Sequence, residues 1–248
     1  MSIGPEAKHK ERQEREDVVL SLLSEGEIEL KGRITWSSNA TFLTEVRGPG
    51  GRSSLAIYKP AKGERPLSDF PRDLWKREVA AYELARWIGW DIVPPTVARP
   101  DGPLGPGSLQ YWVDALEEEH YFTLLERPEH VAALRRVAAF DLVANNADRK
   151  GGHCLLDASG HVWAIDHGLC FHVETKLRTV IWDFAGEEIS DDLLDDLEPL
   201  ATGDVASGVA QFLEAPEVAA LERRARAVRR HGRYPTPTSR WPYPWPLV

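Results

Sequence analysis

The secondary-structure signals of this chain change near residues 112 to 116, and this change constrains its fold more than any other feature. Before it, alternating apolar and polar residues predict strands over 27–36, 41–46 and 53–62. A single helix over 70–89 then precedes a strand pair broken by prolines and glycines. After the change, helical periodicity predominates from Pro128 onward, apart from one hairpin over 154–166. This order predicts an α+β architecture of two lobes, with the cleft between them as the expected ligand site.

The expected divisions of the chain follow from composition. We predict a flexible N-terminus over residues 1–15, a strand-rich lobe over 16–113, a helix-rich lobe over 114–232, and a proline- and aromatic-rich tail over 233–248. Two interpretations of the tail stay open. It is either a polyproline segment that binds a partner or a segment whose tryptophans pack on the protein's own surface. The second is favoured because exposed tryptophan is unusual.

Composition limits the class of protein. An apolar fraction of 42% in 248 residues is typical of a soluble globular chain. No apolar run reaches the roughly 18–20 residues of a membrane helix, and the N-terminus lacks the apolar region of a secretory signal. A net charge of −9 opposes nonspecific binding to nucleic acid. Two cysteines predict a reducing, cytoplasmic location, and the excess of arginine over lysine indicates a bacterial source.

Two acidic turns suggest chemistry. Asp148, in "NNADRKGGHCLL", follows a predicted helix, and Asp166, in "AIDHGLCF", ends the second strand of the hairpin. A helix, a loop and a hairpin in this order can bring the two carboxylates into one site. Phosphoryl transfer from ATP uses one carboxylate to orient or deprotonate an acceptor hydroxyl and another to hold Mg²⁺ on the phosphates.

The first half of the chain contains the two further residues that this chemistry uses. Lys59, in "AIYKP", lies on the third predicted strand, and Glu78, in "WKREVAAYEL", lies midway along the next helix. An ion pair between them would hold the lysine ammonium against the α- and β-phosphates. A solvated lysine at a sheet edge and a solvated glutamate on a helix are the plain alternatives.

Four motifs in this order resemble the phosphatidylinositol 3-/4-kinase-like family, and type II phosphoinositide 4-kinases and their bacterial relatives in particular. The quoted Asp148 and Asp166 motifs resemble its catalytic and metal-binding loops, and "YKPAKGERP" resembles its ATP-lysine strand. The resemblance covers about residues 34–171 and implies a protein-kinase-like fold that binds ATP and Mg²⁺. It makes Asp148 the catalytic aspartate with Arg149 beside it, Asp166 a metal ligand, Lys59 the ATP lysine and Glu78 its partner.

The same resemblance implies the remaining nucleotide contacts. The phosphate loop falls in "WSSNATF", which contains no glycine, so phosphate donors would come from Ser37, Ser38 and Asn39. The segment from Gln110 to Val113 falls where a hinge between lobes would contact adenine through backbone groups. Gln110, Trp112 and Val113 are therefore the expected adenine-binding residues.

Three departures from the family pattern leave alternatives open. His153 stands where the family has an asparagine metal ligand, which implies one metal instead of two, a preference for Mn²⁺, or lost activity. A structural histidine is the plain alternative, and Asp141 on the preceding helix is expected to help structurally. Cys154 and Cys170 flank the motifs, and buried packing is favoured over a redox role. The palmitoylated cysteine cluster of the eukaryotic lipid kinases is absent.

The predicted function is an ATP-dependent phosphotransferase that acts on a hydroxyl of a soluble protein or polyol-type acceptor. Two alternatives remain: a nucleotide-binding pseudokinase with a regulatory or scaffolding role, and an enzyme that transfers AMP on the same fold.

Overall fold

A computed structural model describes residues 5–35 and 39–248. The chain forms two compact units. The first contains the residues up to Trp75 together with Pro95–Trp112, and the second contains Lys76–Pro94 and Val113–Val248. No helix within the described ranges is long and apolar enough to cross a membrane.

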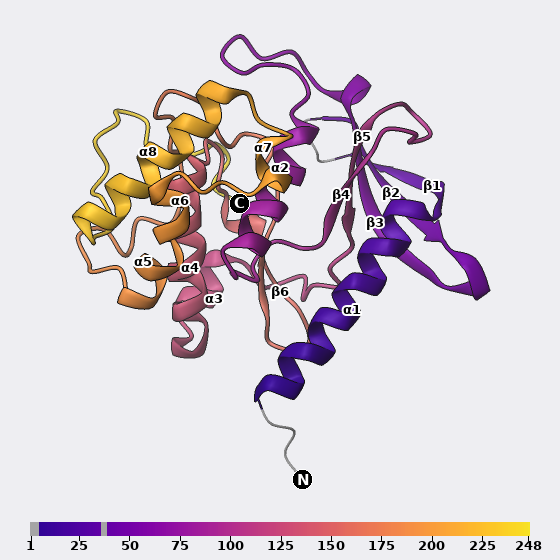
Figure 1. The fold of residues 1–248 in the computed structure, drawn as a ribbon, viewed down its shortest axis with the longest axis horizontal. Helices are drawn as coiled ribbons and strands as arrows, with labels where there is room; N and C mark the ends of the chain where they lie inside the picture. The colour runs from indigo at the N-terminus through magenta and orange to yellow at the C-terminus, as the bar shows by residue number, and fades with distance from the viewer. Residues whose placement is uncertain (1–4, 36–38) are drawn as a thin grey trace. The chain divides into compact units, whose positions relative to one another are not determined.

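A five-stranded antiparallel sheet forms most of the first unit (Figure 1). Its strands are β1 (Glu27–Ile34), β2 (Thr41–Arg47), β3 (Ser53–Pro60), β4 (Thr96–Arg99) and β5 (Gly107–Tyr111), in the order β1-β2-β3-β5-β4. Short 3₁₀ turns, η1 (Pro49–Gly51) and η2 (Ala61–Gly63), flank β3. The predicted strands are confirmed, and Pro60 ends β3 opposite Gly107, as its missing N–H requires.

Helix α1 (Pro5–Glu25) packs beside β4 and β5 in this unit. The core beneath it consists of fully buried residues from the helix and three strands: Leu23, Val46, Ala56, Tyr58 and Leu109. Gly26 ends the helix as predicted. A Cβ there would lie 2.5 Å from Val46 Cγ1, so the close approach of helix and sheet requires glycine.

The flexible N-terminus over residues 1–15 stays a prediction, and α1 begins at Pro5 within it. The segment is rich in lysine, arginine, glutamate and glutamine, which favour helix without any apolar pattern. Residues 1–4 lie outside the described ranges.

Helix α2 (Trp75–Trp87) starts later than expected and groups with the second unit. The sequence suggests a first turn at Pro71. Instead, Asp73 adopts a left-handed conformation with φ 64°, which cannot continue a right-handed helix, and α2 begins two residues later. Its expected C-terminal signal is confirmed, because Gly89 takes φ 74° just after the helix.

The second unit is mostly helical, as predicted, and contains further short and long elements beyond α2. They are α3 (Tyr121–Leu125), α4 (Pro128–Ala144), η3 (Gly151–His153), β6 (Cys154–Leu156), β7 (Val162–Ala164), α5 (Asp191–Asp196), α6 (Glu198–Thr202), α7 (Ser207–Ala210) and α8 (Ala215–His231). Helix α4 packs against α3 and α8, and α6 lies beside α8 (Figure 1).

A buried arginine joins three parts of this unit. Arg77 on α2 forms an ion pair with Glu217 on α8, and its Nε donates to the carbonyl oxygen of Cys170 at 3.0 Å. Both side chains of the ion pair are buried. The second acidic turn therefore leads into a segment that is anchored to α2 and α8.

The tail contradicts the favoured interpretation of its tryptophans. Trp241 is 77% exposed and Trp245 is 87% exposed, so neither packs on the protein's own surface. Pro244, between them, is buried instead. Pro244 therefore packs on the protein while the rings of Trp241 and Trp245 face solvent.

Candidate active site

The loop that carries Asp148 is shaped by two asparagines at the end of α4. Asn145 ends the helix in the left-handed conformation, with φ 59° and ψ 52°. The side chain of Asn146 accepts the backbone N–H of Asp148 at 2.9 Å and donates to Asp141 at 3.0 Å. Asparagine tolerates this backbone conformation and makes local side-chain bonds, so the chain turns sharply here. Asp148 is thereby held next to the helix end.

The side chain of Arg149 is buried, whereas that of the preceding residue, Asp148, is partly exposed. The Arg149 side chain forms a bidentate pair with Asp141, with Nε–Oδ2 at 2.9 Å and Nη2–Oδ1 at 3.0 Å. Its Nη1 also donates to the carbonyl oxygen of Ile165 at 2.7 Å. The guanidinium thus joins α4, the Asp148 loop and the residue before Asp166. These contacts are those of a positioning residue, and they support the structural role expected for Asp141.

The second acidic turn is fixed from two sides. Asp166 adopts a left-handed conformation with φ 61°. The next residue, His167, donates its backbone N–H to Glu78 Oε2 at 3.0 Å, and Glu78 is only 3% exposed. On the other side, His153 Nε2 lies 3.3 Å from Asp166 Oδ2. The structure therefore brings Glu78, His153 and Asp166 together around one turn of the second unit.

The electrostatics of Asp148 reflect its surroundings. Burial raises the pKa of this carboxyl, and the nearby Asp166 carboxylate raises it further. Lys150, whose Nζ lies 3.1 Å from Asp148 Oδ2, and Arg178 act in the opposite direction. A cation bound beside Asp148 would offset this repulsion from the Asp166 carboxylate.

The acidic residues fit a magnesium ion that arrives with a nucleotide. Within the described part of the chain, no group of three or more His, Cys, Asp or Glu side chains could hold a metal ion alone. Mg²⁺ commonly takes only one or two carboxylates and completes its shell with water and substrate phosphates. The side chain of Asp166, the expected metal ligand, is 46% exposed, so its carboxylate oxygens remain accessible for this purpose.

The predicted phosphate-binding residues of the first unit are placed only in part. Lys59 lies half-buried on β3. Ser37 and Ser38 lie outside the described residues. Asn39 Oδ1 accepts the backbone N–H of Arg65 at 2.9 Å, so its side chain already stabilises a neighbouring turn. The pairing of Lys59 with Glu78 stays a prediction, since the two residues belong to different units.

The expected adenine-binding segment is used in part by the sheet. Gln110 is buried on β5, and its side chain donates to Thr96 Oγ1 at 2.9 Å. The backbone N–H of Trp112 donates to the carbonyl oxygen of Leu55 at 3.1 Å. Val113 is buried and begins the second part of the second unit. A contact with adenine at this segment would have to use other backbone groups.

Sequence reasoning missed three residues of the site: Asn146, Lys150 and Arg178. All three contact the Asp148 loop, since Arg178 Nε donates to the carbonyl oxygen of Ala147 at 2.9 Å. Asn146 and Lys150 lie in the quoted motif, where the sequence indicated roles for Asp148, Arg149 and His153 but not for these two residues. An asparagine directly after a predicted helix was the available signal for the first. No sequence signal indicated Arg178.

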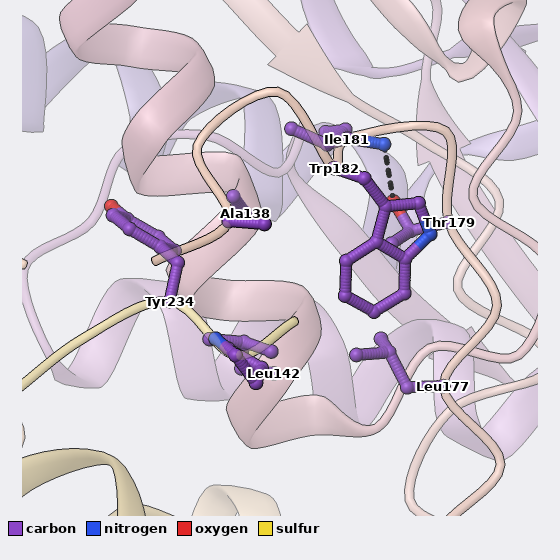
Figure 2. A pocket seen from close by; sticks show the side chains of 9 residues that line it. Ala138, Leu142, Leu177, Thr179, Ile181, Trp182 and Tyr234 are labelled. Atoms are coloured by element: carbon purple, nitrogen blue, oxygen red, sulfur yellow. Dashed lines mark hydrogen bonds between the residues drawn. The ribbon is translucent and has the colours of Figure 1, made fainter. Parts of the chain in front are cut away.

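An apolar pocket lies elsewhere in the second unit, between α4 and the segment 177–185 (Figure 2). Its lining includes Ala138, Leu142, Leu177 and Trp182, whose ring faces the hollow in Figure 2. None of the lining residues is a carboxylate, lysine, arginine or histidine. The pocket therefore does not provide the charges that a phosphate or metal site needs.

We predict that neither cysteine reacts with thiol reagents in the folded protein. Cys154 and Cys170 are fully buried, and burial raises the pKa of Cys154 to about 12 and that of Cys170 well above its usual value. Because the thiolate is the reactive form, both groups should be inert at neutral pH. Titration with Ellman's reagent should detect no thiol in the native protein and two after denaturation. Rapid reaction of one thiol in the native protein would contradict this.

Comparison with solved structures shows the fold. The structure of hydra Fam20 with sugar superposes with a TM-score of 0.60 and 15% sequence identity, covering 86% of each chain. The golgi casein kinase superposes with a TM-score of 0.57 and 14% identity, covering 88% of this chain and 75% of that one. The chain therefore has an α+β kinase-like fold, with a strand-rich and a helix-rich unit.

Comparison of sequences identifies the family. No protein-family model matches the chain. The resemblance to the phosphatidylinositol 3-/4-kinase-like group therefore stays a prediction. Protein Rv2133c of Mycobacterium tuberculosis (strain ATCC 25618 / H37Rv) is 40% identical over 263 residues, which cover 91% of this chain and 94% of the relative. At this identity and coverage, the chain belongs to the family of Protein Rv2133c.

Proposed function

We propose that this protein is an ATP-dependent kinase that transfers the γ-phosphate of ATP to a hydroxyl group. One observation carries the proposal: the second unit gathers Asp148 and Asp166, and each is held by buried polar residues. Buried Asn146 accepts the backbone N–H of Asp148, and buried Glu78 accepts the backbone N–H of His167, the residue after Asp166. A kinase-like fold supports the same conclusion, although a fold alone does not determine a reaction.

The residues of the site have different roles in the proposed reaction. Asp148 orients the acceptor hydroxyl and accepts its proton, and Asp166 binds Mg²⁺, with His153 as the neighbouring candidate ligand. Magnesium bound to the phosphates would neutralise charge that develops during transfer. We assign Lys59, Ser37, Ser38 and Asn39 of the first unit to the phosphates. We assign the segment that contains Gln110, Trp112 and Val113 to the adenine. Arg149 and Glu78 position the two aspartates.

We assign the acceptor to a soluble protein side chain or a polyol-type metabolite. The net charge of −9 disfavours attraction to an anionic lipid surface. One structural neighbour, the golgi casein kinase, is named for a protein substrate class, casein, which supports a side-chain hydroxyl among these acceptors.

Binding measurements separate the roles of Lys59 and Asp166 from that of Asp148. We expect Lys59→Ala and Asp166→Ala each to weaken Mg-ATP binding by about tenfold or more, because each removes a charged contact to phosphate or metal. Isothermal titration calorimetry with Mg-ATP measures this directly. Asp192→Ala, an exposed acid on α5, is a matched control for charge. Equal affinity in all variants would contradict the assigned roles.

A pseudokinase is the second candidate, because His153 already lies against Asp166. We expect His153→Asn to raise the ratio of Mg²⁺-dependent to Mn²⁺-dependent phosphate transfer by about fivefold. The reason is that an amide oxygen suits Mg²⁺ better than an imidazole nitrogen does. Transfer rates with each metal measure this ratio. A lower Mg²⁺ rate in a stably folded variant would show that the site depends on the imidazole. ATP binding without transfer in both proteins would favour the pseudokinase.

A further inference from the structure

The last residues of the chain lie against the Asp148 loop. We call residues 241–248 the strap. Trp241, Tyr243 and Trp245 of the strap are exposed, whereas Pro244 is buried. An exposed side chain adds little to the stability of its own segment, so we expect buried Pro244 and the backbone to hold the strap. Two backbone carbonyls provide that attachment.

The first attachment is to the segment that follows the second acidic turn. The carbonyl oxygen of Pro242 accepts the backbone N–H of Thr179 at 3.0 Å and the indole N–H of Trp182 at 3.2 Å. This segment pairs in turn with the Asp148 loop. Arg149 donates its N–H to the carbonyl of Arg178, and its own carbonyl accepts the N–H of Val180, both at 3.0 Å.

The second attachment is to the loop itself. Gly151, three residues after Asp148, donates its backbone N–H to the carbonyl oxygen of Leu247 at 2.7 Å. Gly151 is buried, and a Cβ there would lie 3.0 Å from the ring of Phe122 and 3.3 Å from Leu247 oxygen. A side chain at residue 151 would therefore crowd both Phe122 and the strap, which favours glycine at this position.

The strap completes the hydrogen bonding of the loop backbone. The backbone N–H groups of residues 146 to 150 donate to acceptors outside the strap. In chain order these acceptors are Asp141 O, Leu169 O, Asn146 Oδ1, Arg178 O and His153 Nδ1. The next N–H, that of Gly151, is received by the strap. A buried N–H that loses its acceptor is unfavourable, and two adjacent glycines can change conformation easily. Without the strap, the loop would lose the restraint nearest its glycines.

We propose that the strap positions the catalytic loop, and that the bond between Gly151 N–H and Leu247 oxygen fixes the placement of Asp148. This inference rests on the proposed kinase function. The strap does not cover the acidic groups, because with it in place Asp148 is still 27% exposed and Asp166 46% exposed. It therefore acts as a support and does not block the site.

The test is a chain that ends at Pro246, which removes the Leu247 carbonyl but keeps the Pro242 attachment and buried Pro244. We expect kcat for γ-phosphate transfer, with water or the protein itself as acceptor, to fall about ten- to a hundredfold. The Kd for Mg-ATP should stay within about twofold, since the bond removed goes to Gly151, which is not assigned to the nucleotide. Amide hydrogen exchange at Gly151 should become about tenfold faster or more.

Trp245→Ala, which changes an exposed ring and leaves both carbonyls, is the matched control and should behave as the full chain in all three measurements.

The outcomes distinguish this inference from the proposed function. Faster exchange at Gly151 together with lower kcat, in a variant with an unchanged thermal midpoint, supports it. Unchanged kcat in the shortened chain, or an equal loss in Trp245→Ala, overturns the positioning role while the kinase function stands. A full chain that binds Mg-ATP but transfers no phosphate overturns the proposed function, and this inference with it.

Discussion

Replacing Asp148 by asparagine is expected to lower the rate of γ-phosphate transfer by about a hundredfold or more, the usual contribution of a positioned general base. Asparagine keeps the shape of the side chain but cannot accept the proton of the acceptor hydroxyl. The backbone of residue 148 should stay in place, because its N–H is held by Asn146 and the loop is anchored by Arg149. Initial rates at saturating Mg-ATP measure the effect.

The control for this prediction is affinity for the nucleotide. Mg-ATP should bind the Asp148→Asn variant with a Kd within about twofold of the original, because only the transition state uses this carboxylate as a base. Asp192→Asn makes the same charge change at an exposed position on α5 and should retain full activity. Retention of more than half the transfer rate in Asp148→Asn would show that another group acts as the base.

Replacing Asp141 by alanine is expected to lower the free energy of unfolding by about 3–5 kcal/mol, because it leaves a buried guanidinium without its counterion. Arg149 is fully buried and Asp141 is 1% exposed. Burial alone would lower the pKa of Arg149, but the Asp141 carboxylate outweighs burial and the pKa is raised, so the arginine stays charged. Urea denaturation followed by circular dichroism measures the loss.

A double variant separates the pair from its surroundings. Asp141→Leu combined with Arg149→Met removes both charges and should be more stable than Asp141→Ala alone, since neither partner remains buried and unpaired. An Asp141→Ala variant that loses less than about 1 kcal/mol would contradict the account. It would mean that the carbonyl of Ile165 and the ring of His167, which also contact Arg149, satisfy the guanidinium without a carboxylate.

The fold could be predicted largely from periodicity. The five strands, the helix beginning at Pro128 and the hairpin after it all have a repeating apolar pattern or a clear turn signal. The start of α1 was missed because its first residues are charged helix formers that show no pattern. The start of α2 was missed because the left-handed conformation of Asp73 depends on its surroundings and has no local signal.

The candidate site could be predicted less completely. The sequence places Asp148 and Arg149 side by side, but it does not reveal that the first is partly exposed and the second buried against Asp141. That difference depends on the left-handed turn at Asn145 and on the contacts of the loop with residues 165–180. Likewise, the bond from His167 to Glu78 joins residues that are 89 positions apart in the sequence. The bond between the strap and the loop spans a similar separation in the sequence. Contacts of this range leave no local pattern.

The most direct test of the central claim follows the fate of labelled ATP. The purified chain is incubated with Mg²⁺ and ATP labelled on either the α- or the γ-phosphate, alone and with candidate protein and polyol acceptors. The account predicts that label from the γ-position appears in a product and that label from the α-position does not. It also predicts that Asp148→Asn slows the transfer by about a hundredfold or more. Transfer of the α-label would show that AMP is donated. Binding of ATP with no transfer of either label would contradict a kinase altogether.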